Sequence, residues 1–153
     1  MTCPICGCKM PQKTMCVYCK ITGEQVENAS NKEAKRRIKN HDRKEVYYST
    51  TLPKDVNRTK LLMLTILFGF LGVGDYYIGK YAKGLYCTFS WVLYLPFGIT
   101  NIVMGYSSFF FRLMSEITAV LVIFALFFWI ADIIAIVAKI YKTPVVLGER
   151  HKK

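Results

Sequence analysis

The sequence has few of the residue patterns on which enzyme active sites depend. It has only two histidines, His41 and His151, and both lie in polar segments where exposure to solvent accounts for them. It has no glycine-rich phosphate loop, and no nucleophile stands at a recognisable spacing from a base. The first residues also lack a charged start followed by an apolar stretch, so we expect no signal peptide. These absences favour a protein that is not an enzyme.

Charge is nearly missing from one half of the chain. Residues 1–60 carry 13 of the 21 Lys and Arg and six of the ten acidic residues, with few large aliphatic side chains. The charged residues between Leu61 and Ala138 are Asp75, Lys80, Lys83, Arg112, Glu116 and Asp132. Although 153 residues would suit one domain, halves that differ so sharply are not expected to share one core.

Three long apolar runs indicate a membrane protein. They span residues 61–78, 84–111 and 117–138, and the first is this long only if Asp75 is tolerated within it. About 20 apolar residues cross the roughly 30 Å hydrocarbon core of a bilayer as a helix. The alternative is a set of buried helices in a soluble protein, but so short a chain has too little polar surface to enclose all three runs.

The number of crossings stays at two or three. The basic N-terminal arm, above all the cluster at residues 54–60, favours a cytoplasmic N-terminus by the positive-inside rule. Pro96 and Gly98 interrupt the second run, which could therefore bend, re-enter or lie partly in the interface. Two crossings would leave the basic C-terminal tail in the cytoplasm, and three would leave it outside.

Two cysteine pairs near the N-terminus predict a metal site. Cys3 and Cys6 form one Cys-x-x-Cys pair, and Cys16 and Cys19 form a second pair, separated from the first by nine residues. Two such turns can face each other and supply four thiolates tetrahedrally, for which structural zinc is the usual metal. Iron and disulfides are the alternatives. A cytoplasmic arm lies in a reducing compartment, where paired thiols more often hold a metal than form disulfides. Cys8 could replace Cys6 as a ligand.

The spacing at residues 3–19 resembles that of zinc ribbons and rubredoxin-like knuckles, and the Cys-Pro-x-Cys-Gly turn is its distinctive half. The sixth cysteine, Cys87, lies in the second apolar run and is most simply a small buried hydrophobe.

A basic helix is expected between the cysteines and the apolar half. Ser30 and Glu33 stand at capping-box spacing and predict a helix from about Asn31 to Glu45. A solvated linker is one interpretation of this helix. The other is that its cations bind anionic lipid headgroups on the cytoplasmic leaflet. The residues concerned are Lys35, Arg36, Arg37, Lys39, Arg43 and Lys44. Nucleic acid is a weaker expectation, because no aromatic stacking pattern accompanies the charge.

Two motifs in the apolar half resemble those of the two-transmembrane (TM-two) domain family. Residues 69–80, followed by Gly84-Leu85, are similar to that family's glycine-rich turn, approximately Gly-x-His-Asp-Phe-Tyr-x-Gly-[Arg/Lys]. Residues 128–134 are similar to the aromatic-Trp-x-x-Asp signature of its second helix. The matching residues are Gly72, Asp75, Tyr76, Tyr77, Gly79, Trp129 and Asp132.

The chain also departs from the family pattern. Gly74 stands where many members have His, and an Asp-Arg-Phe order found in other members is absent, so no signalling role is carried over. About 30 extra residues, roughly 95–124, separate the two motifs and turn what resembles one family helix into two apolar runs.

Asp75 and Asp132 are ionisable residues in apolar segments, which are functional candidates by default. Their partners could be Lys80, Lys83, Arg112, the hydroxyls of Tyr76 and Tyr77, or water. A simpler interpretation is that Asp75 caps a turn and Asp132 faces water near a helix end.

We therefore expect a membrane all-α fold, a glycine-rich helical hairpin with an additional apolar helical segment. The expected parts are a zinc-ribbon-like knuckle (1–28), a basic helix and linker (29–59), a membrane domain (60–141) and a basic tail (142–153). The expected function is that of a noncatalytic protein of the cell membrane, whose cytoplasmic zinc-stabilised module binds a partner protein or the membrane surface. The alternative is an ion or proton transport or sensing component that uses Asp75 and Asp132, within a homo-oligomer.

Overall fold

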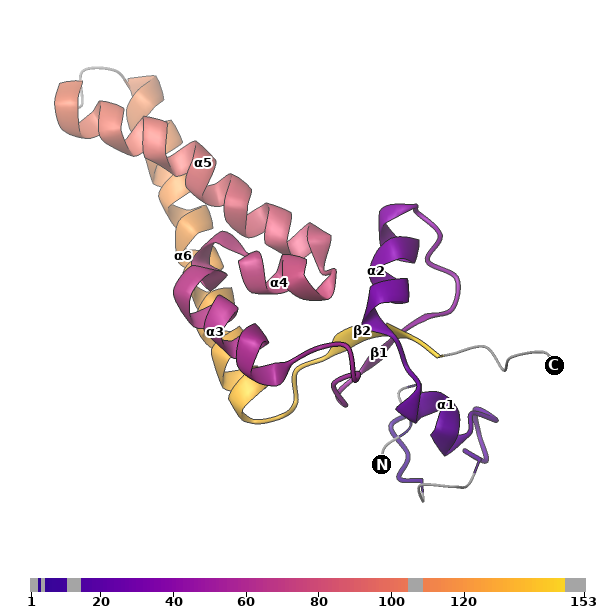
Figure 1. Cartoon of the computed structure of the whole chain (residues 1–153). Helices are drawn as coiled ribbons and strands as arrows, with labels where there is room; N and C mark the ends of the chain where they lie inside the picture. Colours follow the sequence, from indigo (N-terminus) through magenta and orange to yellow (C-terminus); the bar gives the residue numbers. More distant parts are fainter. Residues whose placement is uncertain (1–2, 4, 11–14, 105–108, 148–153) are drawn as a thin grey trace. The chain divides into compact units, whose positions relative to one another are not determined.

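The computed structural model describes residues 3, 5–10, 15–104 and 109–147 (Figure 1). The chain divides into two compact units. We call one the sheet unit, formed by Met1–Leu61 together with Ala135–Lys153, and the other the helical unit, Leu62–Ile134. The sheet unit therefore joins segments from the two ends of the chain. The four parts predicted from the sequence treat the two ends of the chain as separate, so they miss this connection.

A two-stranded sheet connects the ends of the chain within the sheet unit. Strand β1, Val46–Ser49, pairs antiparallel with β2, Thr143–Val146, so that Val46 lies opposite Val146 and Ser49 opposite Thr143. Every residue of β2 is buried. Valine and tyrosine favour strands because their side chains suit a half-buried pleated surface. The fold is mostly helical, but this sheet corrects the all-α expectation. The end of the predicted tail, residues 148–153 with His151, lies outside the described residues.

Helix α2, Asn31–Lys39, begins where the sequence predicts and ends six residues earlier. Ser30 is its N-cap and accepts a hydrogen bond from the Glu33 amide. The expected end at Glu45 is wrong because His41 has a φ of 61°, a left-handed conformation that ends a helix. Arg43 and Lys44 consequently lie beyond the helix, in the connection to β1. A shorter helix, α1 (Gly23–Glu27), precedes α2.

The first apolar run is not one long helix. It forms α3 (Arg58–Phe68), the 3-10 turn η1 (Gly69–Leu71) and α4 (Val73–Ile78). Gly72 separates η1 from α4 and Gly79 ends α4, with φ values of 79° and 90°, which glycine adopts without the clash that a Cβ brings. The 11 residues of α3 rise only about 17 Å, well short of the roughly 30 Å hydrocarbon core.

The other two runs form long apolar helices. Helix α5 spans Tyr81–Met104 and continues through Pro96, and α6 spans Phe109–Val137. Both are long and apolar enough to cross a membrane by length and composition. Only 11% of the most apolar stretch of α5 and 17% of that of α6 are buried within the chain. Most of the surface of both helices is therefore not covered by the rest of the described chain.

Candidate metal centre and buried ion cluster

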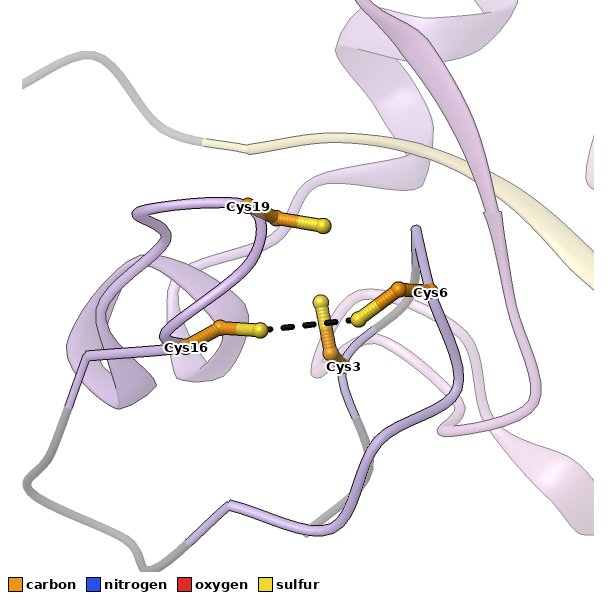
Figure 2. Close-up of side chains that lie close together, drawn as sticks. All are labelled: Cys3, Cys6, Cys16 and Cys19. Atoms are coloured by element: carbon orange, nitrogen blue, oxygen red, sulfur yellow. Dashed lines mark hydrogen bonds between the residues drawn. The ribbon is translucent and has the colours of Figure 1, made fainter.

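The four predicted thiols come together. The sulfur atoms of Cys3, Cys6, Cys16 and Cys19 all lie within 4.8 Å of one another (Figure 2). Zinc holds four thiolates at about 2.3 Å, which places tetrahedral sulfurs about 3.8 Å apart. The Cys6 and Cys16 sulfurs already stand at 3.5 Å. The donor set therefore fits a closed four-coordinate metal site, with zinc and iron both compatible with it.

Tight turns aim each cysteine pair at the centre. The Gly7 amide donates to the Cys3 carbonyl at 2.9 Å, and the Lys20 amide donates to the Cys16 carbonyl at 2.8 Å. Both turns end in a left-handed residue, Gly7 with φ 73° and Lys20 with φ 55°. The glycine after the first cysteine pair is a sequence signal for such a turn. The lysine at the equivalent position after the second pair is not, so the sequence does not show that the two turns share a conformation.

The thiols differ in acidity because their surroundings differ. Hydrogen bonding from the Cys19 amide is the main cause that lowers the pKa of Cys16 to about 7. Desolvation, followed by the thiols of Cys6 and Cys3, raises the pKa of Cys19 to about 12. A coordinating metal deprotonates such thiols outright and removes this difference.

The other two cysteines lie outside this group. Cys8 does not belong to the cluster of four and contributes its backbone carbonyl, which accepts from the Cys3 amide at 2.8 Å. The structure therefore favours Cys6 as the ligand that the sequence left open. Cys87 is buried in α5 as a small apolar side chain. All six cysteines are free thiols.

The two candidate carboxylates meet at one lysine in the helical unit. Lys83 of α5 places its Nζ 2.6 Å from both carboxylate oxygens of Asp132 on α6. The same Nζ lies 3.9 Å from Asp75 Oδ2 on α4. The side chains of Asp75, Asp132 and Lys83 are 3%, 14% and 28% exposed. Of the partners considered from the sequence, Lys83 forms an ion pair with both acids. Lys80 also interacts electrostatically with both, while Arg112 pairs with Glu116.

Close packing surrounds this ion cluster. The indole Nε1 of Trp129 donates to the Thr65 carbonyl at 2.6 Å. A Cβ at Gly69 would lie 2.5 Å from the Trp129 ring, so that position accepts only glycine without movement. Gly72 likewise lies against the backbone of Gly84, which a Cβ would approach to 2.6 Å. The contact of Gly69 with Trp129 therefore joins the two family-like motifs, as Lys83 does through Asp75 and Asp132, whereas the contact of Gly72 with Gly84 lies within the first motif.

The two tyrosines of the motif lie beside these contacts. The Tyr76 hydroxyl lies 3.2 Å from Thr88 Oγ1, which itself donates to the Leu71 carbonyl. Tyr77 is half-buried, and Gly79 ends α4.

The predicted membrane-binding cations are not equally available. On α2, Arg36 and Arg37 bind Glu33 at 2.9 and 3.2 Å, and Arg37 also binds Glu45 at 2.7 Å. These pairs compete with any headgroup for the two guanidinium groups. The remaining members of the set are Lys35 and Lys39 on the helix, and Arg43 and Lys44 after it.

Asp55 makes a helix-capping contact that the sequence does not predict. Its carboxylate accepts from the amides of Asn31 and Lys32 at 3.2 and 2.7 Å, at the N-terminus of α2. Glu33 had been expected to complete the capping box, but its side chain binds Arg36 and Arg37 instead. A carboxylate at a helix N-terminus is favourable, but this one is 24 residues away in sequence and carries no local signal.

Comparisons with protein-family models, with curated proteins and with solved structures find no match to this chain.

Proposed function

We propose that this chain is a noncatalytic integral membrane protein in which a zinc-held module, joined in sequence to a two-helix hairpin, binds a partner on the cytoplasmic side. In this proposal α5 and α6 cross the bilayer, and the knuckle with α2 and the β1–β2 sheet stays in water. The observation that carries it is the four-thiol group, which lies in the same unit as the two chain segments that leave the hairpin.

The sheet supports an even number of crossings. Strand β1 precedes the apolar half and β2 follows it, and their pairing needs both strands on one side of a bilayer. The isolated bridge between Ser30 and Val146 adds a second connection of the same kind. Two crossings also put the basic arm and the basic C-terminal segment together in the cytoplasm, in agreement with the positive-inside rule.

A structural metal suits a module with so little core. Few apolar side chains are buried near the knuckle, chiefly Met10 together with Cys3 and Cys16. A group this small supplies little hydrophobic stabilisation, and metal binding supplies folding free energy in such small sites. A closed four-cysteine centre leaves no open coordination position for catalysis. Zinc is therefore proposed as a rigid support for a binding surface.

The membrane half is proposed to be related to the two-transmembrane domain family. The contact between the two motifs that carry the resemblance supports this, since Lys83 bridges Asp75 and Asp132, one from each motif. The same bridge favours a structural role for the carboxylates over ion or proton transport, because both carboxylates already pair with a cation of the chain. We propose that this ion cluster holds α4, α5 and α6 together.

Crosslinking in intact membranes tests the proposed binding role. The full chain should capture one reproducible partner protein after crosslinking, and the double variant Cys3→Ser/Cys6→Ser should lose it. Cys8→Ser is the matched control, because it removes a thiol that is not in the cluster, and capture should be unchanged. Equal capture by all three chains would contradict the proposal. Extraction of the wild-type chain by alkaline carbonate would contradict membrane insertion separately.

A further inference from the structure

A cavity of about 400 Å³ opens in the sheet unit, where α3 begins and α6 ends. Its volume falls in the range of small-molecule sites, about 300–1,000 Å³. The walls combine two cations, three hydroxyl groups and an apolar surface. Among the residues that line it are Thr51, Arg58, Leu61, Ile136, Lys139 and Tyr141. No acidic side chain lines this cavity within the described part of the chain.

Arg58 is held in place by the end of α6. Its Nη2 donates to the carbonyl oxygens of Ile136 and Val137, at 2.5 and 2.9 Å. These carbonyls belong to the last turn of the helix, which has no intrahelical donors for them. Both bonds use the same nitrogen, so Nε and Nη1 keep their N–H groups for another acceptor. The guanidinium is thereby oriented at the cavity before a ligand arrives.

Lys139 occupies a position that ordinarily favours another residue. The Lys139 amide donates to the Ile136 carbonyl, and the Ile140 amide donates to the Ala135 carbonyl, which is the Schellman pattern at the end of a helix. The left-handed residue of this motif is usually glycine or asparagine, and here it is Lys139, with φ 62°. A lysine at this site costs conformational energy and places an exposed ammonium at the cavity.

The cavity lies where the apolar helices give way to polar chain. Leu61, which starts the first apolar run, is fully buried, and Ile136 is the last buried residue of α6. If α5 and α6 cross a bilayer, this boundary falls at the depth of the lipid headgroups. A site there meets phosphates next to cations and acyl carbons next to leucine and isoleucine.

We propose that this cavity binds the phosphate headgroup of an anionic phospholipid, with Arg58 and Lys139 at the phosphate and the first acyl carbons against Leu61 and Ile136. The inference rests on the proposed function, because it needs the hairpin in a bilayer. It differs from adsorption through the basic face of α2, since its two cations come from separate chain segments and line the same cavity.

Native mass spectrometry of the full-length chain in detergent tests the site. The chain is given equal amounts of phosphatidylglycerol and phosphatidylcholine with identical acyl chains, and the retained adducts are counted. The wild type should favour phosphatidylglycerol. Lys139→Asn should reduce that preference about fivefold, as expected for one cation near a lipid phosphate. Asparagine suits the left-handed backbone at this position, so the variant should fold.

Lys54→Asn is the matched control, because it removes an exposed lysine from the same unit but not from the cavity. Its lipid preference should equal that of the wild type. An equal loss in both variants would overturn the site in favour of diffuse charge, and no preference in the wild type would overturn it altogether. Loss of the preference in excess inorganic phosphate would show that the free ion is the ligand and would overturn the lipid. Carbonate extraction tests insertion independently, so failure of the proposed function remains distinguishable.

Discussion

The side-chain amide of Asn31 donates a 2.8 Å hydrogen bond to the carbonyl oxygen of Pro144, 113 residues further along the chain. Asn31 is only 1% exposed, and Pro144 is fully buried. The bond joins the first residue of α2 to the middle of β2, so it ties the N-terminal arm to the segment that follows the apolar helices. Together with the β1–β2 ladder it closes the sheet unit.

Replacement of Asn31 by alanine should destabilise this closure. The Pro144 carbonyl would stay buried without that donor, which costs about 1–3 kcal/mol. Thermal unfolding of the purified chain in detergent measures the loss. Lys39→Ala on the exposed side of the same helix is the control and should change stability little. Equal stability of the two variants would show that the bond is not a significant part of the closure.

Metal removal should act on the knuckle alone. Purified wild-type chain should contain about one zinc per chain by elemental analysis, since four thiolates complete one tetrahedral site. Cys16→Ser should lose the metal, and a chelator should expose amides of the knuckle to hydrogen exchange. Cys8→Ser should keep the full metal content. Absence of zinc or iron from the wild type would disprove the metal centre, and retention in Cys16→Ser would disprove this ligand set.

The features of the fold and of the metal site that could be predicted from the sequence are those that rest on interactions between residues close together in the chain. The cysteine ligands were predictable because each Cys-x-x-Cys pair forms its own tight turn, and the second pair follows after only nine residues. The long apolar helices α5 and α6 were predictable from composition, since no charge interrupts most of their length. Their insertion in a membrane stays a prediction.

The sheet and its contacts were not predictable in the same way. Strand β2 has only four residues, one of them proline, and its partner β1 lies almost a hundred residues earlier, so no local pattern marks the pairing. The end of α2 was missed because His41 adopts a left-handed conformation that a lone histidine does not signal. Lys83 was one of several candidate partners, and only the packing of α4, α5 and α6 selects it.

The buried ion cluster should contribute far more to stability than an exposed pair does. Lys83→Met would remove the ammonium that pairs with both Asp75 and Asp132, and breaking a buried pair costs about 3–5 kcal/mol. Arg112→Gln breaks the Arg112–Glu116 pair, whose side chains are 61% and 63% exposed, and should cost under about 1 kcal/mol. Thermal unfolding of both variants in detergent provides the comparison. Similar losses would contradict a structural role for Lys83.

Acid should weaken α2 through Glu33. Hydrogen bonds from Arg36 and then Arg37 hold the pKa of this carboxyl below its usual 4.5. A lowered pKa means that the stabilisation is fully present above the unfolded value and is lost as pH falls through the folded value. Nuclear magnetic resonance of the Glu33 carboxyl carbon should give a midpoint below 4.5, and Arg36→Gln should move it upward. An unshifted midpoint would show that the ion pairs do not persist in solution.

The position of the two chain ends relative to the bilayer tests the account most directly. A reporter that is active only in the cytoplasm is fused to the N-terminus in one chain and to the C-terminus in another. Because β1 and β2 are paired across the hairpin, both fusions should be active to a similar degree. Activity at only one end would require an odd number of crossings, and it would contradict both the pairing of β1 with β2 and the proposed two-crossing arrangement.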